Sequence, residues 1–165
     1  MNDAHFHLVV NHLPIIFPIA GLIVLAVGIG FKAEIVKRTA YFIFCIAAIT
    51  AAIAMNSGEG AEEIVEHLPG VTEHLIHEHE ESAEFFALLS YVFGVFSLFA
   101  LWSSWKKNSY NTVLSYIIAF FAILLIFIGK QTATSGGEIR HIEIRSSAAK
   151  NQSEQSEKVE IHYKD

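Results

Sequence analysis

Hydrophobic residues in this chain gather in four long stretches that contain no charged residue. Each stretch approaches or exceeds the roughly 20 residues that a helix needs to cross the hydrocarbon core of a bilayer. The stretches are Leu8–Phe31, Thr39–Asn56, Phe85–Trp105 and Ser109–Gly129. This pattern predicts an all-α fold, a bundle of four transmembrane helices with spans at about 8–31, 39–57, 82–105 and 109–134.

The connection between the second and third spans carries a pattern of its own. In Gly60–Leu68, apolar and acidic residues recur with the period of an amphipathic helix, so we expect a short separate helix there. Pro69-Gly70 should end it, and Thr72 is placed to cap the helix that leads into the third span. Gly136-Gly137 marks a stop after the fourth span.

The chain therefore divides into a membrane domain, residues 1–145, and a polar tail, residues 146–165. Apolar and polar residues alternate in His141–Arg145 and again in Val159–Tyr163, with a Ser-, Gln-, Glu- and Lys-rich segment between them. Two interpretations of the tail stay open: a disordered segment, or a short β-ribbon outside the membrane.

Composition supports a protein in contact with the lipid bilayer. The hydrophobic fraction is 53%, whereas soluble domains have about 45–50%. The first apolar stretch lacks a basic leading segment and a cleavage site, so we expect it to be a retained helix and not a signal peptide. The single cysteine, Cys45, excludes a disulfide framework. A net charge of −6 without a basic patch gives no indication of nucleic-acid binding.

Basic residues in the loops predict how the bundle is oriented. Lys32, Lys37 and Arg38 follow the first span and Lys106 and Lys107 follow the third, whereas Ser57–Glu84 has no Lys or Arg. The positive-inside rule places the two basic loops in the cytoplasm. Both termini and the 57–84 connection, with its short helix, are then extracytoplasmic, and a bacterial inner membrane is the expected location. The basic residues of the C-terminal tail count against this orientation.

All nine histidines fall on the predicted outer side or at the outer ends of spans. They are His5, His7, His12, His67, His74, His77, His79, His141 and His162. Imidazole is the commonest protein ligand for metals and the usual axial ligand of haem iron. The distribution therefore indicates a haem or metal site near the outer interface. The alternative is a solvated acidic loop that contains incidental histidines.

Helix periodicity selects His12 and His79 as the pair that faces the bundle interior. A stripe of small residues in the third span marks its inward face, and this stripe reaches His79 when extended back by one turn. His12 lies just inside the first apolar stretch, where an ionisable group is unfavourable unless it has a partner. Two opposed imidazoles are what a bis-histidine haem b requires, with His7 and His141 as alternative ligands or supporting groups. A single interhelical hydrogen bond is the alternative role for His12.

Haem would also need cationic partners for its propionates. Lys130 at the outer end of the fourth span, and Arg140 just beyond it, lie at a suitable height. Both side chains also have a simpler interpretation, since long basic side chains commonly extend from a helix end to the membrane interface.

A second hypothesis requires no haem. His74, His77, Glu78 and Glu81, together with His12 and His79, offer the mixed nitrogen and oxygen ligands that a divalent metal ion such as zinc, copper or iron accepts. A metal-binding or metal-sensing membrane protein is the corresponding function.

Two short motifs support a family resemblance. The segment His7-Leu-Val-Val-Asn-His12-Leu-Pro14 resembles the His-x4-His-x-Pro opening of a bacterial family of small four-helix membrane domains of unknown function. The segment Gly136-Gly137-Glu138 is similar to the Gly-Gly-Glu closing motif of the same family. Related domains occur beside cytochrome-like modules, so the resemblance implies a role in haem binding or electron transfer. The long 57–84 connection and the tail after Arg145 depart from the family pattern.

We therefore expect a b-type, cytochrome-like membrane protein that takes part in electron transfer or belongs to a redox complex. Its expected partners are the lipid bilayer and other respiratory or redox membrane subunits, and a homo-oligomer is compatible with the sequence. The alternatives are the metal-binding protein described above and a structural accessory subunit without a cofactor. The sequence does not decide whether the protein is an enzyme.

Overall fold

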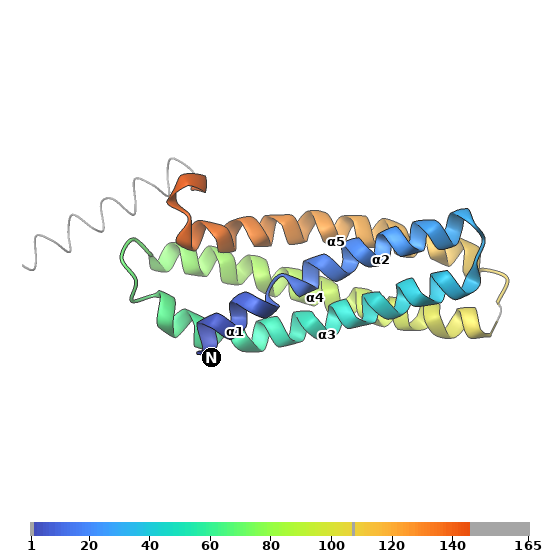
Figure 1. The fold of residues 1–165 in the computed structure, drawn as a ribbon, viewed down its shortest axis with the longest axis horizontal. Coiled ribbons are helices and arrows are strands. Elements are labelled where there is room, and N and C mark those ends of the chain that lie inside the picture. The colour runs from blue at the N-terminus through green and yellow to red at the C-terminus, as the bar shows by residue number, and fades with distance from the viewer. Residues whose placement is uncertain (1, 107, 146–165) are drawn as a thin grey trace, which may run out of the picture.

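The computed structural model describes residues 2–106 and 108–145, which form a bundle of four long helices (Figure 1). A short helix, α1 (Asp3–Val10), precedes the four long ones. These are α2 (Leu13–Gly30), α3 (Glu34–Val65), α4 (Glu73–Trp105) and α5 (Asn111–Arg140), and a turn of 3-10 helix, η1 (Ile142–Ile144), follows. Neighbouring long helices run antiparallel: α2 and α4 each pack against both α3 and α5, and α1 packs against α3. The predicted all-α four-helix bundle is confirmed.

Each of the four units is long and apolar enough to cross a membrane. The segments with that property are Asp3–Gly30, Glu34–Val65, Glu73–Trp105 and Asn111–Arg140. Large apolar side chains on their outer faces are exposed, among them Ile23 (63%), Val95 (70%) and Phe120 (65%). A soluble protein rarely exposes so much contiguous apolar surface, but lipid covers it at no cost. These helices indicate an integral membrane protein.

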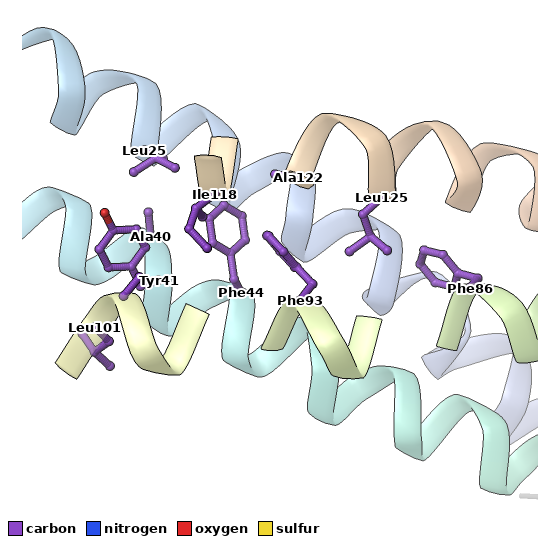
Figure 2. Packing of buried hydrophobic residues seen from close by; sticks show 11 residues of the cluster. Leu25, Ala40, Tyr41, Phe44, Phe86, Phe93, Leu101, Ile118, Ala122 and Leu125 are labelled. Carbon is purple, nitrogen blue, oxygen red and sulfur yellow. The ribbon is translucent and has the colours of Figure 1, made fainter. Parts of the chain in front are cut away.

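The core is built by side chains from all four long helices (Figure 2). Phe44 of α3 and Phe93 of α4 lie at its centre, with ring centroids 4.8 Å apart. Gly21 of α2 lets α2 approach this pair, because a Cβ atom at Gly21 would collide with the ring of Phe44. The tight centre fixes how the helices are placed at both ends of the bundle.

Polar contacts hold the end of the bundle that carries the α2–α3 and α4–α5 turns. Lys37 of α3 is buried (4% exposed) and forms an ion pair with Glu34. Arg38 donates to the hydroxyl of Ser104 at 3.0 Å and to its backbone carbonyl at 2.8 Å. Ser104 in turn donates to Glu34 at 3.1 Å. The beginning of α3 is thereby tied to the end of α4.

The first span is interrupted where the sequence predicted a continuous helix. α1 ends at Val10, and α2 begins at Leu13 after a turn at Asn11 and His12. Pro14 explains the interruption: it has no N–H to donate, and in a continuous helix its ring would clash with the carbonyl of Val10. Because of this turn, residues of α1 and residues of α2 do not follow one continuous helical periodicity.

Two other helices run further than predicted. The expected separate helix at 60–68 is wrong: α3 continues without a break to Val65, and Pro69 with Gly70 (φ 76°) then turns the chain. α5 likewise continues through Gly136-Gly137 to Arg140. The predicted helix start at Thr72 is confirmed, although its side chain forms no capping hydrogen bond. Ile142–Ile144 form the 3-10 turn and not a strand. The tail, residues 146–165, lies outside the described residues.

Candidate functional site

Eight of the nine histidines belong to the described residues, and all eight lie at one end of the bundle (Figure 1). We call this the histidine end: α1, the start of α2, the α3–α4 connection with the turns that flank it, and the end of α5. The basic residues of the α2–α3 and α4–α5 turns lie at the opposite end. We call that opposite end the basic end, but Arg140 and Arg145 lie at the histidine end, at the end of α5 and just after η1.

Only two of these histidines, His7 and His79, are half-buried; the other six are exposed. His7 comes from α1 and His79 from α4. The two rings are near enough to interact electrostatically. The bundle thus brings together two imidazoles from helices that are distant in sequence.

His7 is held by a serine on α3. Its Nδ1 atom lies 2.9 Å from Oγ of Ser57. Ser57 donates its hydroxyl hydrogen to the carbonyl of Ala54, one turn earlier in α3, at 2.9 Å. α1 lies close against α3 here, because a Cβ atom at Gly60 would come within 2.9 Å of Asp3.

His79 is held in the same way by a serine on α5. Its Nδ1 atom lies 3.1 Å from Oγ of Ser135. Ser135 donates to the carbonyl of Thr132, again one turn earlier, at 3.0 Å. The two histidines therefore have matching surroundings. His7 of α1 contacts a serine of α3, and His79 of α4 contacts a serine of α5.

The serines are compatible with one tautomer of both rings. A hydroxyl group has one hydrogen, and each serine can place it on a backbone carbonyl. The serine oxygen can then accept from Nδ1. Each histidine also forms a hydrogen bond with the same carbonyl, that of Ala54 or Thr132. A neutral imidazole with Nδ1–H has its lone pair on Nε2.

A glycine gives the ring of His79 room beside its serine. Gly136 follows Ser135, and a Cβ atom there would lie 2.8 Å from Cε1 of His79. Gly58 follows Ser57, and a Cβ atom there would lie 3.8 Å from Cε1 of His7. A side chain at Gly136 would thus be too close to His79, whereas one at Gly58 would be in ordinary contact with His7. A Ser-Gly dipeptide opposite each histidine is a repeated signal that the sequence carried and that pattern analysis missed.

His12, expected to form the inward pair with His79, has an exposed ring in the structure. It occupies the position before α2, makes no capping hydrogen bond, and lies near enough to His7 to interact electrostatically. Its neighbour Asn11 has a buried Oδ1 with no hydrogen-bond partner among the described residues. The residue next to His12 in the sequence thus has a buried hydrogen-bond acceptor that is not satisfied within the described residues.

The other predicted site residues lie at the surface. Lys130 and Arg140 are both exposed. His141 is exposed as well, and its Nδ1 lies 2.8 Å from a carboxylate oxygen of Glu143. None of these three contacts the two half-buried histidines through a hydrogen bond or ion pair in the described part of the chain.

The predicted His/Glu cluster consists of exposed pairs along α4. His74 lies 3.4 Å from Glu78, and His77 lies 3.3 Å from Glu81. Within residues 2–106 and 108–145, no three histidine, cysteine or acidic side chains are arranged to hold a metal ion together. His7 and His79 are better candidates for a ligand site than these exposed pairs, because both are half-buried and each has Nδ1 beside a serine oxygen.

Comparison with protein-family models, with curated proteins and with solved structures gave no match for this chain. The family resemblance therefore rests on the two histidine- and glycine-containing motifs alone.

Proposed function

We propose that this chain is a b-type, cytochrome-like membrane protein that binds haem between His7 and His79. The observation that carries the proposal is the matched pair of His–Ser–carbonyl contacts, which in the Nδ1–H tautomer offers two Nε2 atoms as ligands. Metal-ligating histidines usually donate their other ring N–H to a nearby oxygen, and this second bond fixes the ring. Nδ1 of His7 and of His79 each lie beside such an oxygen.

The donor set suits haem better than a bare metal ion. Structural zinc sites take four protein ligands, whereas bis-histidine haem takes two imidazoles, and the macrocycle supplies the rest. The described histidine end offers two inward imidazoles and no third inward ligand. Haem, when bound, would supply a one-electron couple. The protein's own residues hold and orient the ligands: Ser57 and Ser135 contact the two Nδ1 atoms, and Gly136 admits the ring of His79.

His7 takes the role that periodicity had assigned to His12, because the ring of His7 is the one tied to α3 beside His79. His12 is the alternative ligand, as an exposed neighbour of His7. Electron transfer to a redox subunit is the proposed activity, and a self-associated form is compatible with it.

The distribution of basic residues supports the proposed orientation. Lys32, Arg38 and Lys106 lie at or near the two turns of the basic end. By the positive-inside rule that end faces the cytoplasm, and the histidine end is extracytoplasmic. In a bacterial inner membrane the proposed haem would then lie near the outer surface.

An absorption spectrum of the detergent-purified chain tests the proposal, recorded oxidised and dithionite-reduced alongside elemental analysis. A Soret band that shifts on reduction is the expected result. Bound zinc, copper or iron without that band would favour the metal-binding hypothesis instead. Absence of both would leave the structural accessory subunit and would contradict the proposal.

A further inference from the structure

Arg145 is the most buried cation at the histidine end, with 5% of its surface exposed. It follows η1, and its side chain folds back over the end of α5. Nε donates to the carbonyl of Glu138 at 2.6 Å, and Nη2 donates to the carbonyl of Ile139 at 2.9 Å. The guanidinium thereby satisfies two of the carbonyls that a helix end leaves unpaired.

The third nitrogen of this guanidinium, Nη1, is buried and has no hydrogen-bond partner within residues 2–106 and 108–145. No acidic side chain of those residues forms an ion pair with Arg145 either. Capping of α5 explains two nitrogens and not the third. A buried charge with an unpaired donor is unfavourable unless an anion completes it. Nη1 therefore indicates an anionic partner.

Arg145 and His79 both contact the last turns of α5, Arg145 through backbone carbonyls and His79 through the side chain of Ser135. Ser135, which holds His79, and Ile139, whose carbonyl accepts from Arg145, are four residues apart. That spacing is one turn, about 6 Å along the axis. Ile139 is buried and Ser135 is half-buried, so this face points into the bundle. The carbonyls that hold the guanidinium thus lie about one turn beyond the serine that holds His79, towards the end of α5.

We infer that Nη1 of Arg145 binds a carboxylate of the group held by His7 and His79. This inference rests on the proposed function, in which that carboxylate is a haem propionate. It replaces the sequence-based expectation for Lys130 and Arg140, whose side chains are exposed. A buried guanidinium that is already fixed by two carbonyls binds a carboxylate with little loss of side-chain freedom.

The test compares haem with its dimethyl ester, in which both propionates are uncharged. Full-length protein stripped of haem is titrated with each, and binding is followed at the Soret band. The unmodified protein should bind haem roughly 10-fold or more tightly than the ester, as expected for one charge-assisted hydrogen bond in a buried site. In Arg145→Met that preference should fall to near one.

Arg140→Met is the matched control, since it removes an exposed cation from the last turn of α5 and should leave the preference unchanged. Arg145→Gln keeps a donor for the helix carbonyls without the charge, and it serves if the methionine variant does not fold by circular dichroism. The inference is overturned if the unmodified protein binds haem and the ester equally tightly, or if the folded Arg145 variants keep the preference for haem. Haem binding itself would stand in either case. No Soret band with either porphyrin overturns the proposed function and the inference together.

Discussion

The Nδ1 atom of His79 lies 3.1 Å from Oγ of Ser135, and the hydroxyl of Ser135 donates onward to the carbonyl of Thr132. This contact orients the ring of His79. Removal of an outer-shell hydrogen bond of this kind weakens metal binding by about 10- to 100-fold. Ser135→Ala should therefore lower haem affinity by roughly 10-fold, measured by haem transfer to an acceptor protein.

Thr134→Ala is the control for that variant. Thr134 is exposed, and its hydroxyl donates to the carbonyl of Lys130 in its own helix. It should leave haem affinity unchanged. Equal effects of the two substitutions would show that the serine hydroxyl has no special role at His79.

Gly136→Ala should displace His79 without unfolding the protein. The new Cβ atom would lie 2.8 Å from Cε1 and 3.2 Å from Nε2 of the ring. Overpacking costs about 1–3 kcal/mol, and the gain in helix propensity offsets about 1 kcal/mol of it. Stability is thus an insensitive readout, and the low-spin haem spectrum decides the outcome. A spectrum identical to that of the unmodified protein would contradict the placement of the ring.

Gly30→Ala provides the comparison, because a Cβ atom at Gly30 meets no other atom within 4 Å. We expect it to raise the free energy of unfolding by about 0.4–1 kcal/mol, as glycine-to-alanine changes do at compatible sites. Its haem spectrum should not change.

Arg38→Ala tests the basic end independently of any cofactor. It removes two hydrogen bonds to Ser104, one to its hydroxyl and one to its backbone carbonyl at the end of α4. Loss of a hydrogen bond to a charged group costs about 1.5–3 kcal/mol, so denaturant unfolding in detergent should shift to lower midpoints. Lys32→Ala, at an exposed residue in the turn that precedes α3, should shift the midpoint far less. If Lys32→Ala destabilised the protein as much as Arg38→Ala, the hydrogen bonds between Arg38 and Ser104 would not explain the effect.

Ser97→Ala should be neutral or stabilising by about 1 kcal/mol, because the hydroxyl of Ser97 is fully buried and has no partner in the described part of the chain. Ser90→Ala, which removes a hydroxyl bonded to the carbonyl of Phe86, is the matched comparison and should not stabilise. Thermal unfolding of both variants measures the difference. A loss of stability in Ser97→Ala larger than in Ser90→Ala would indicate a partner for Ser97.

The bundle itself could be predicted because long uncharged stretches have few structural alternatives. The stripe of small residues in the third span also led to His79, and the ring of His79 does lie between α4 and α5. Helix ends were harder to predict. Charged residues mark where an apolar stretch stops, but α3 continues past them to Val65, and Gly60 on this part of the helix lies against α1.

The choice between His7 and His12 depended on one local event. The break before Pro14 leaves His7 in α1 and His12 in the turn that precedes α2, so the two rings do not follow the periodicity of one helix. A proline near a helix start is compatible both with a kink and with a new helix, so periodicity alone could not decide. The burial of Arg145 could not be predicted from the sequence either, since it arises from how η1 folds back over the end of α5.

Electron paramagnetic resonance of the oxidised, detergent-purified protein tests the central claim most directly, because the signal reports the axial ligands of the iron. The unmodified chain and His12→Ala should both give a low-spin bis-imidazole signal, whereas His7→Ala and His79→Ala should each lose it. A low-spin signal that survives in His7→Ala or His79→Ala, or no haem signal in the unmodified chain, would contradict the account.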